Sequence, residues 1–212
     1  MWEILFQNQN FIAINKPCHL AVHQEENQIS LTHTLAEQLG LERVWLLHRL
    51  DKATSGVLLL ALNDQTASEL AQQFSAKTMH KTYLAMSDAK PSKKQGWIKG
   101  GMKKSRRGVW KLTRDTSNPA ITQFHSHTLA PHLRLFVLRP HTGKTHQLRV
   151  GMKSLGSPII GDRLYGGTAA ERMFLHAWQI EFQHRDEHFK ITAPLDATWP
   201  YEHIYAVLSS SL

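Results

Sequence analysis

The densest group of chemically able side chains lies within residues 48–56, where one carboxylate, Asp51, stands among cations and hydroxyls. Its companions there are His48, Arg49, Lys52, Thr54, Ser55 and Gly56. A carboxylate beside an arginine stays ionised well below neutral pH. An ionised carboxylate held on a tight turn can act as a nucleophile or as a general base. The alternative is a structural role, in which Asp51 bridges two strands through Arg49.

Two short apolar runs frame this group and would position it. Val44–Leu47 leads into the group, and Val57–Leu62 leads out of it. Both runs have the length, and the flanking polar and glycine residues, that are typical of buried strands. The sequence therefore predicts a rigid turn between two core strands, which is the kind of support that a catalytic carboxylate needs.

A second polar group, Arg139–Val150, follows a predicted strand at Leu133–Leu138 and opens a predicted helix at Thr145–Leu155. On a helix, His146 and Arg149 are three residues apart and adjoin. A helix start that presents arginine and histidine suits an anion. The alternative is an ordinary solvated helix start.

The charge of the chain is strongly one-sided between Ala89 and Arg114, where no Asp or Glu occurs. The formal net charge of the whole chain of 212 residues is +8. The cations of this stretch are Lys90, Lys93, Lys94, Lys99, Lys103, Lys104, Arg106, Arg107, Lys111 and Arg114, and Trp97 and Trp110 are interleaved with them. Such a surface suits a phosphate backbone and stacked bases, whereas the alternative is a solvated loop.

The remaining pattern predicts an α+β fold in a single domain, residues 1–212. One helix is expected at Ile29–Gly40, with Ser30 as N-cap and Gly40 as its stop. Another is expected at Asp64–Lys77, capped by Asp64 or Thr66. The predicted strands form an antiparallel or mixed sheet and lie at Phe11–Asn15, Gly96–Met102, Gly108–Thr113, Ala120–Thr128, Leu133–Leu138 and within a tail from Phe174 to Ala193.

Other kinds of active site are poorly supported. His184–His188 has the spacing of an inverted zinc-protease motif, but its flanks alternate like the strands of a hairpin, so we expect a polar turn and no metal. No serine lies in the G-x-S-x-G sequence that typically holds a serine nucleophile. No residue near Cys18 is indicated as the base that a cysteine nucleophile would need. No phosphate-binding glycine loop occurs, and Gly100-Gly101 and Gly166-Gly167 are predicted to be turns. An aspartyl-phosphate hydrolase would need a second carboxylate soon after Asp51.

The sequence also bears on the compartment. A single cysteine excludes an internal disulfide and fits a reducing cytosol. No signal peptide and no apolar run long enough to span a membrane is visible. We therefore expect a cytoplasmic protein.

Together these motifs resemble the RluA-type pseudouridine synthases, which isomerise uridine to pseudouridine in RNA. The resemblance covers nearly the whole chain and rests on Lys16-Pro17 with Val22-His23, His48–Asp51 with Thr54–Gly56, Lys81 with Tyr83, Thr142–Arg149, Gly161-Asp162 with Tyr165-Gly166, and Leu175–Ala177. It implies the pseudouridine synthase fold, which has a central mixed, mainly antiparallel sheet, flanking helices and a cleft across the sheet.

The resemblance also implies residue roles. Asp51 would be the catalytic carboxylate, Arg149 its ion-pair partner, and Tyr83 the ring that stacks on the uracil. Arg49 would displace the target base from its stack. Other RNA contacts would come from His48, Lys81, Lys103, Lys104, Arg106, Arg107, Lys144 and His146. No cofactor or metal is expected, because substrate and product are isomers. The partner would be a structured tRNA or rRNA stem-loop, without a membrane or an obligatory protein partner.

The sequence departs from the family pattern at three places. Cys18-His19 stands where a glycine usually follows Lys-Pro, Lys144 replaces an arginine, and Gly151 replaces a common histidine. These departures concern substrate choice more than activity. The small N-terminal RNA-binding domain of many relatives is expected to be absent, since only fifteen residues precede Lys16. The alternative function is an RNA-binding protein of the same fold whose catalysis is vestigial.

Overall fold

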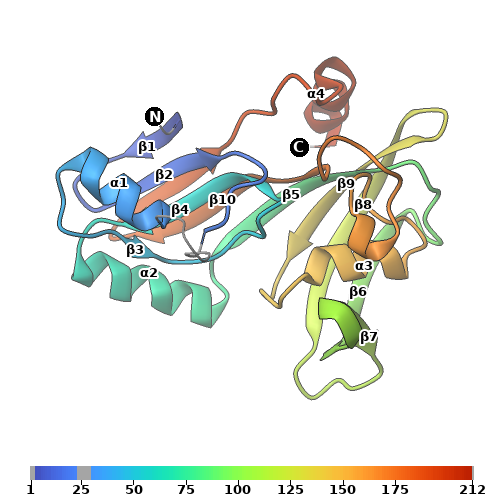
Figure 1. Ribbon diagram of the computed structural model, residues 1–212, viewed down its shortest axis with the longest axis horizontal. Coiled ribbons are helices and arrows are strands. Elements are labelled where there is room, and N and C mark those ends of the chain that lie inside the picture. Colours follow the sequence, from blue (N-terminus) through green and yellow to red (C-terminus); the bar gives the residue numbers. More distant parts are fainter. Residues whose placement is uncertain (1–2, 23–29, 212) are drawn as a thin grey trace. The chain divides into compact units, whose positions relative to one another are not determined.

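The computed structural model describes residues 3–22 and 30–211. His23 and Ile29 therefore lie outside the described residues. The chain divides into two compact units, and neither is continuous in sequence. The first consists of Met1–Lys81 and Ala177–Pro194, and the second of Thr82–His176 and Leu195–Leu212. Figure 1 colours the chain by residue number, so the segments of each unit can be followed in it. A single catalytic domain, residues 1–212, stays a prediction.

The first unit is built on one group of neighbouring strands. Its strands are neighbours in the order β1 (Glu3–Gln7), β2 (Phe11–Lys16), β4 (Ser55–Ala61) and β10 (Leu175–His184). Two further strands extend it, because β3 (Trp45–Leu46) pairs with β4 and β11 (Glu187–Thr192) pairs with β10. The two runs that frame Asp51 thus form strands, as the sequence predicts.

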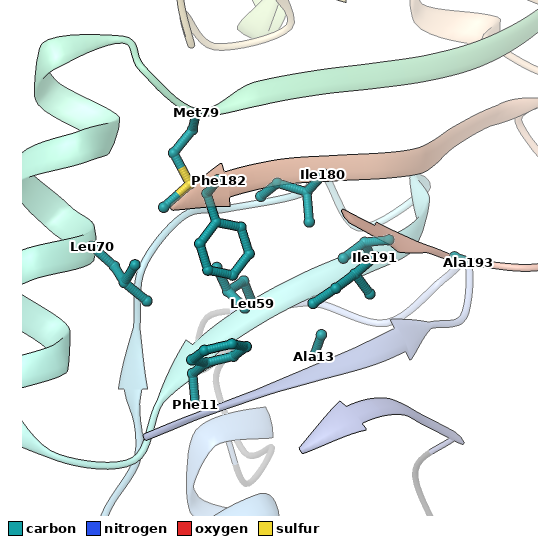
Figure 2. Close-up of a cluster of buried hydrophobic side chains, with 10 residues drawn as sticks. Phe11, Ala13, Leu59, Leu70, Met79, Ile180, Phe182, Ile191 and Ala193 are labelled. Carbon is teal, nitrogen blue, oxygen red and sulfur yellow. The ribbon is translucent and has the colours of Figure 1, made fainter. Parts of the chain in front are cut away.

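The core of the first unit explains why these strands form. Successive side chains of a strand point to opposite faces, and Ala13 of β2 lies opposite Leu59 of β4. Figure 2 shows both in one cluster with Phe11, Phe182 and further apolar side chains from β10, β11 and α2. The alternate residues of β2 and β4 are also fully buried. Each large side chain contributes about 1.5–3 kcal/mol by leaving water, so both strands are firmly held.

Two capped helices complete the first unit. Helix α1 spans Leu31–Leu39, and the Ser30 side chain accepts a hydrogen bond from the backbone N–H of His33, as expected of an N-cap. Helix α2 spans Asp64–Ala76, but its cap is Asn63, which accepts from the N–H of Thr66. The prediction that Asp64 or Thr66 caps α2 was wrong by one residue or more. Asn63 is already extended, as an N-cap must be.

The second unit contains a five-stranded antiparallel arrangement. The strands follow the order β5 (His80–Ser87), β9 (Leu133–Pro140), β8 (Ala120–Ala130), β6 (Gln95–Lys104) and β7 (Trp110–Thr113). Short 3-10 turns lie at η1 (Arg106–Gly108) and η2 (Arg163–Tyr165), and helices at α3 (Gln147–Ser154) and α4 (Tyr201–Ser211). Figure 1 shows α3 lying against the strands of this unit. The predicted basic first hairpin, β6–β7, is confirmed. The predicted meander was wrong at one step, because β6 pairs through residues 95–100 with β8 and through residues 101–104 with β7, so that β6 lies between β7 and β8.

Several local predictions needed correction. Helix α3 begins at Gln147 rather than Thr145, because His146 adopts a left-handed conformation with φ of 55° that a helix cannot continue through. Gly100-Gly101 lies inside β6 and not in a turn. A Cβ atom on Gly101 would lie 2.7 Å from the carbonyl oxygen of Asp115, so glycine allows the chain after β7 to cross closely. Strand β1 and helix α4 were not foreseen, whereas the turn between β10 and β11 was.

Candidate active site

Asp51 lies on a tight turn directly before β4. Its backbone carbonyl accepts a hydrogen bond from the N–H of Thr54 at 2.9 Å. Thr54 and Ser55 are buried, and Asp51 itself is half-buried. Because β4 is buried along its whole length, the turn leads directly into the core of the first unit. The predicted turn before a buried strand is thereby confirmed, while its rigidity and the catalytic role of Asp51 stay predictions.

A buried lysine ties a second loop to this turn. Lys16, at the end of β2, is fully buried, and its ammonium donates to the carbonyl oxygens of Pro17 at 2.8 Å and Leu20 at 2.9 Å. It also donates to the carbonyl oxygen of Lys52 at 3.3 Å, within the Asp51 turn. A buried charge requires such partners. His19 takes φ of 67° in this loop, a left-handed conformation that glycine adopts more readily than histidine.

His48 supports the turn from the other side. Its Nε2 atom accepts a hydrogen bond from the backbone N–H of Leu59 at 3.0 Å, and its ring stacks on Phe74 of α2 at 5.1 Å between centroids. Burial, and then the positive charge of Lys81, lower the pKa of His48 from 6.5 to about 3. The imidazole is therefore neutral at physiological pH. Its contribution is to position the loop rather than to attract phosphate as a cation.

The two other cations of this region lie in different surroundings. Arg49 is exposed, as a residue that reaches into RNA should be. Lys81 is half-buried, with its ammonium 5.8 Å from the centroid of the Phe74 ring, and burial lowers the pKa of Lys81. Arg49 is thus the more accessible of the two to a polyanion.

Gly56 is required by a close backbone approach at the start of β4. Its φ is 109°, which side chains rarely adopt, and a Cβ atom there would lie 2.2 Å from the carbonyl oxygen of Ala177 on β10. No side chain fits that space without moving the backbone. This glycine therefore fixes where β4 leaves the Asp51 turn.

The other two proposed catalytic residues belong to the second unit. Tyr83 lies half-buried on β5, opposite Leu138 of β9. Arg149 lies on α3 and forms a bidentate ion pair with Asp162, Nε to Oδ2 at 2.7 Å and Nη2 to Oδ1 at 2.8 Å. The Asp162 side chain is only 1% exposed, and that of Arg149 11%. This geometry fixes the guanidinium plane, and the sequence alone gave no reason to select Asp162 as its partner.

The loop that precedes α3 is held by one buried amide, that of Gln147. Its Oε1 atom accepts from the Thr142 hydroxyl at 2.7 Å and from the Lys144 N–H at 3.0 Å. Its Nε2 atom donates to the Ile121 carbonyl oxygen and to the Thr122 hydroxyl. Gln147 thus fastens the loop to β8. The Lys144 ammonium, an expected RNA contact, donates to the Asn118 side chain at 2.7 Å.

Tyr165 connects α3 to the basic hairpin. Its side chain is 1% exposed, and its hydroxyl oxygen accepts from the Trp110 N–H of β7 at 2.9 Å. The same hydroxyl lies 2.8 Å from Nδ1 of His146, and the Arg149 guanidinium carbon lies 5.0 Å from the ring centroid. One buried side chain therefore holds two of the proposed site residues and one strand of the hairpin.

The basic hairpin presents its expected cations to solvent. Lys103 and Lys104 end β6, Arg106 begins η1, and all three are exposed. Arg107 is the second residue of η1. Gly151, where relatives often carry histidine, faces Ile98 of β6, because a Cβ atom there would lie 3.0 Å from Ile98 Cδ1. A larger side chain at this position would displace Ile98.

The predicted site residues thus divide between the units. Asp51, His48, Arg49 and Lys81 belong to the first, whereas Tyr83, Arg149 and the hairpin belong to the second. Sequence reasoning did not select Lys16, Asp162 or Tyr165 as supporting residues, although all three lie in the family motifs. Its position at the end of an apolar strand was the one feature of the sequence that could have indicated a buried, supporting role for Lys16.

Two negative findings apply to the described part of the chain. Residues 3–22 and 30–211 contain no group of three or more His, Cys, Asp or Glu side chains placed to hold a metal ion. Within the same residues, no helix has the length and apolar character needed to cross a membrane.

The fold and this arrangement of motifs define an RNA-modifying isomerase. The sequence profile of the RNA pseudouridylate synthase family matches residues 10–154, more than half of the chain. The chain belongs to that family. The α+β fold prediction is confirmed by a solved structure, human RNA pseudouridylate synthase domain containing 4. It superposes with a TM-score of 0.77 at 27% identity, over 95% of this chain and 90% of that one.

Curated relatives from bacteria agree with this assignment. An uncharacterized RNA pseudouridine synthase of Haemophilus influenzae is 53% identical over 90% of this chain and 86% of its own length. The ribosomal large subunit pseudouridine synthase C of Rickettsia bellii is 40% identical over 84% of this chain and 62% of its own. The tRNA pseudouridine synthase C of Haemophilus influenzae is 32% identical over 94% and 95%, respectively.

Proposed function

We propose that this protein converts uridine to pseudouridine in rRNA or tRNA, with Asp51 as the catalytic carboxylate. The family match spans Asp51, Tyr83 and Arg149. One of the relatives described above is named as an enzyme of ribosomal RNA and another as an enzyme of tRNA. Both kinds of RNA are therefore candidate substrates.

The observation that carries the proposal is the construction of the Asp51 turn. The backbone hydrogen bond to Thr54, the Lys16 ammonium on the Lys52 carbonyl and the His48 imidazole on β4 all hold one short segment. A carboxylate supported in this way loses little entropy when it meets its substrate, which is how positioned groups accelerate reactions.

The proposed reaction is an isomerisation. The bond between N1 of uracil and C1′ of the ribose breaks, the base turns, and a bond between C5 and C1′ forms. The proton on C5 is released and N1 gains one, so atoms and electrons balance without an oxidant or reductant. Asp51 acts at the ribose, as nucleophile or base, while the base is detached.

The other roles follow the family resemblance. Tyr83 stacks on the uracil, Arg149 supplies a positive charge to the reaction, and Arg49 displaces the target base from its stack. Extruding a base costs a few kcal/mol, which an aromatic face and an inserted guanidinium offset. The bidentate contact with Asp162 fixes the orientation in which Arg149 presents its charge.

The basic hairpin supplies the affinity for RNA. Lys103, Lys104 and Arg106 are exposed, and the stretch from Ala89 to Arg114 contains no acid that would repel phosphates. Binding should therefore weaken steeply as salt rises, because each neutralised phosphate releases counterions.

Release of tritium from 5-tritiated uridine in bulk RNA tests the proposal, since binding alone releases none. Asp51→Asn preserves the size of the side chain but removes its charge. We expect this variant to bind RNA in a filter assay and to release no tritium. Asp64→Asn is the matched control, because Asp64 is an exposed acid of the same unit that pairs with Arg43, and it should retain activity. Turnover by Asp51→Asn would refute the assignment, and binding without turnover by the wild type would favour the vestigial alternative.

The substrate requires a separate experiment. Pseudouridines mapped in rRNA and tRNA from cells with and without this protein should differ at one or a few positions. A difference confined to one class of RNA would assign the substrate, and identical maps would contradict the proposal.

A further inference from the structure

One face of the second unit carries an exposed tryptophan among cations. Trp97 on β6 has a large ring and is 50% exposed. The Lys99 ammonium lies 5.2 Å from the centroid of its ring, and the ring of His141 lies 5.1 Å away at an interplanar angle of 48°. Trp110, the other tryptophan between Ala89 and Arg114, is half-buried. The two rings therefore differ in exposure, which the sequence did not indicate.

The register of the strands shows that this tryptophan is part of a larger surface. Trp97 lies opposite Gln123 of β8, and Gln123 lies opposite Arg139 of β9. In the next row, Lys99 lies opposite Ile121, whose carbonyl accepts the N–H of His141. Side chains in register across neighbouring strands share one face. The stacking face is the set Trp97, Lys99, Ile121, Gln123, Arg139 and His141.

This face is opposite to the one that carries the proposed catalytic tyrosine. Tyr83 lies opposite Leu138, which lies opposite Phe124. Those residues alternate with Arg139 and Gln123, so they point the other way. Helix α3 also lies on the Tyr83 side, because Gln147 bonds the Thr122 hydroxyl there; Figure 1 shows the helix against these strands. The stacking face is therefore separate from the residues assigned to the target uridine within this unit.

The composition of the face selects its ligand. It contains two permanent cations, a histidine, an amide and a large exposed ring, and no carboxylate. Single-stranded nucleic acid is bound by this combination, in which bases stack on aromatic rings while cations follow the backbone.

We propose that the stacking face binds an unpaired base of the RNA substrate, at a position away from the uridine that is isomerised. The inference rests on the proposed function for the identity of the substrate. Trp97 provides the ring, and Lys99 and Arg139 hold the neighbouring phosphates. The face lets the enzyme contact RNA on both sides of the strands of its second unit.

Binding of fluorescently labelled single-stranded oligouridylate, and of a duplex of the same length, tests the proposal on the full chain. Trp97→Ala should weaken single-strand binding between about 5-fold and 150-fold and should affect the duplex much less. Its salt dependence should remain unchanged, whereas Lys99→Ala should reduce the salt slope by about 0.7. Trp97→Phe should lose less than Trp97→Ala, because a phenyl ring still stacks. It also keeps the test valid if the alanine variant folds poorly.

The control is Tyr205→Ala, which removes an exposed ring on α4 and should leave binding unchanged. Equal single-strand affinity for the wild type and Trp97→Ala would overturn the inference, and so would an equal loss on duplex RNA. Tritium release by the wild type separates the two proposals. Release together with unchanged binding by Trp97→Ala would refute only the stacking face, whereas no release would refute the proposed function.

Discussion

Replacing Tyr165 with phenylalanine tests whether one hydroxyl holds the site of the second unit together. The ring and its contact with Arg149 remain, and only the oxygen is lost. That oxygen accepts the Trp110 N–H at 2.9 Å and lies 2.8 Å from His146 Nδ1. A hydrogen bond contributes about 0.5–1.5 kcal/mol net, so two bonds lower the free energy of unfolding by roughly 2 kcal/mol when removed. For a chain of this size that corresponds to a fall in Tm of about 4–8 °C.

Urea denaturation of Tyr165→Phe, with Tyr205→Phe as control, measures this loss. Tyr205 is 59% exposed, so removing its hydroxyl should change the free energy of unfolding by less than about 0.5 kcal/mol. A change of similar size for Tyr165→Phe would refute the reasoning, because it would mean that the buried hydroxyl contributes nothing net.

The same variant has a spectroscopic signature. The Tyr165 hydroxyl lies 2.8 Å from Nδ1 of His146, and the tautomer of the imidazole decides which of the two atoms donates. Nitrogen chemical shifts of His146 should therefore differ between the wild type and Tyr165→Phe. Identical shifts in the two proteins would contradict the hydrogen bond.

The remaining predictions concern the Asp51 turn. Gly56→Ala should destabilise the protein by about 3 kcal/mol or more, because the new Cβ meets the Ala177 carbonyl at 2.2 Å in addition to the backbone strain. Gly40→Ala, with φ of 65° and no atom within 4 Å, should cost only about 1 kcal/mol in the same urea assay; equal costs would exclude the clash. The fold lowers the pKa of His48 to about 3. As pH drops from 6.5 towards 3, the imidazole is therefore protonated in the unfolded chain but not in the folded one, and the free energy of unfolding falls. At pH 5 the loss is at most about 2 kcal/mol. The glutamine oxygen of His48→Gln can still accept from the Leu59 N–H, and this variant should not show the loss of stability at low pH. A pH profile of stability that is the same in the variant and the wild type would show that His48 is not the titrating group.

Much of the local structure could be predicted from the sequence because its causes are local. Ser30 and Gly40 mark the ends of α1 by their own conformational preferences. The alternation along β6, β8 and β9 predicted antiparallel strands, and the apolar runs on either side of residues 48–54 predicted two strands, of which β4 is buried and β3 half-buried. Where local signals compete, the prediction failed. Asn63, Asp64 and Thr66 are all good caps, and the choice depends on where the preceding strand stops.

The long-range contacts that support the site were decided by tertiary structure. The sequence determined the family, the order of the motifs and Asp51 as the candidate carboxylate, since these depend on which residues follow one another. It could not show that Asp162 pairs with Arg149 or that His48 is neutral. Each of these depends on burial and on neighbours brought from distant parts of the chain. For the same reason, only the fold distinguishes the exposed ring of Trp97 from the half-buried ring of Trp110.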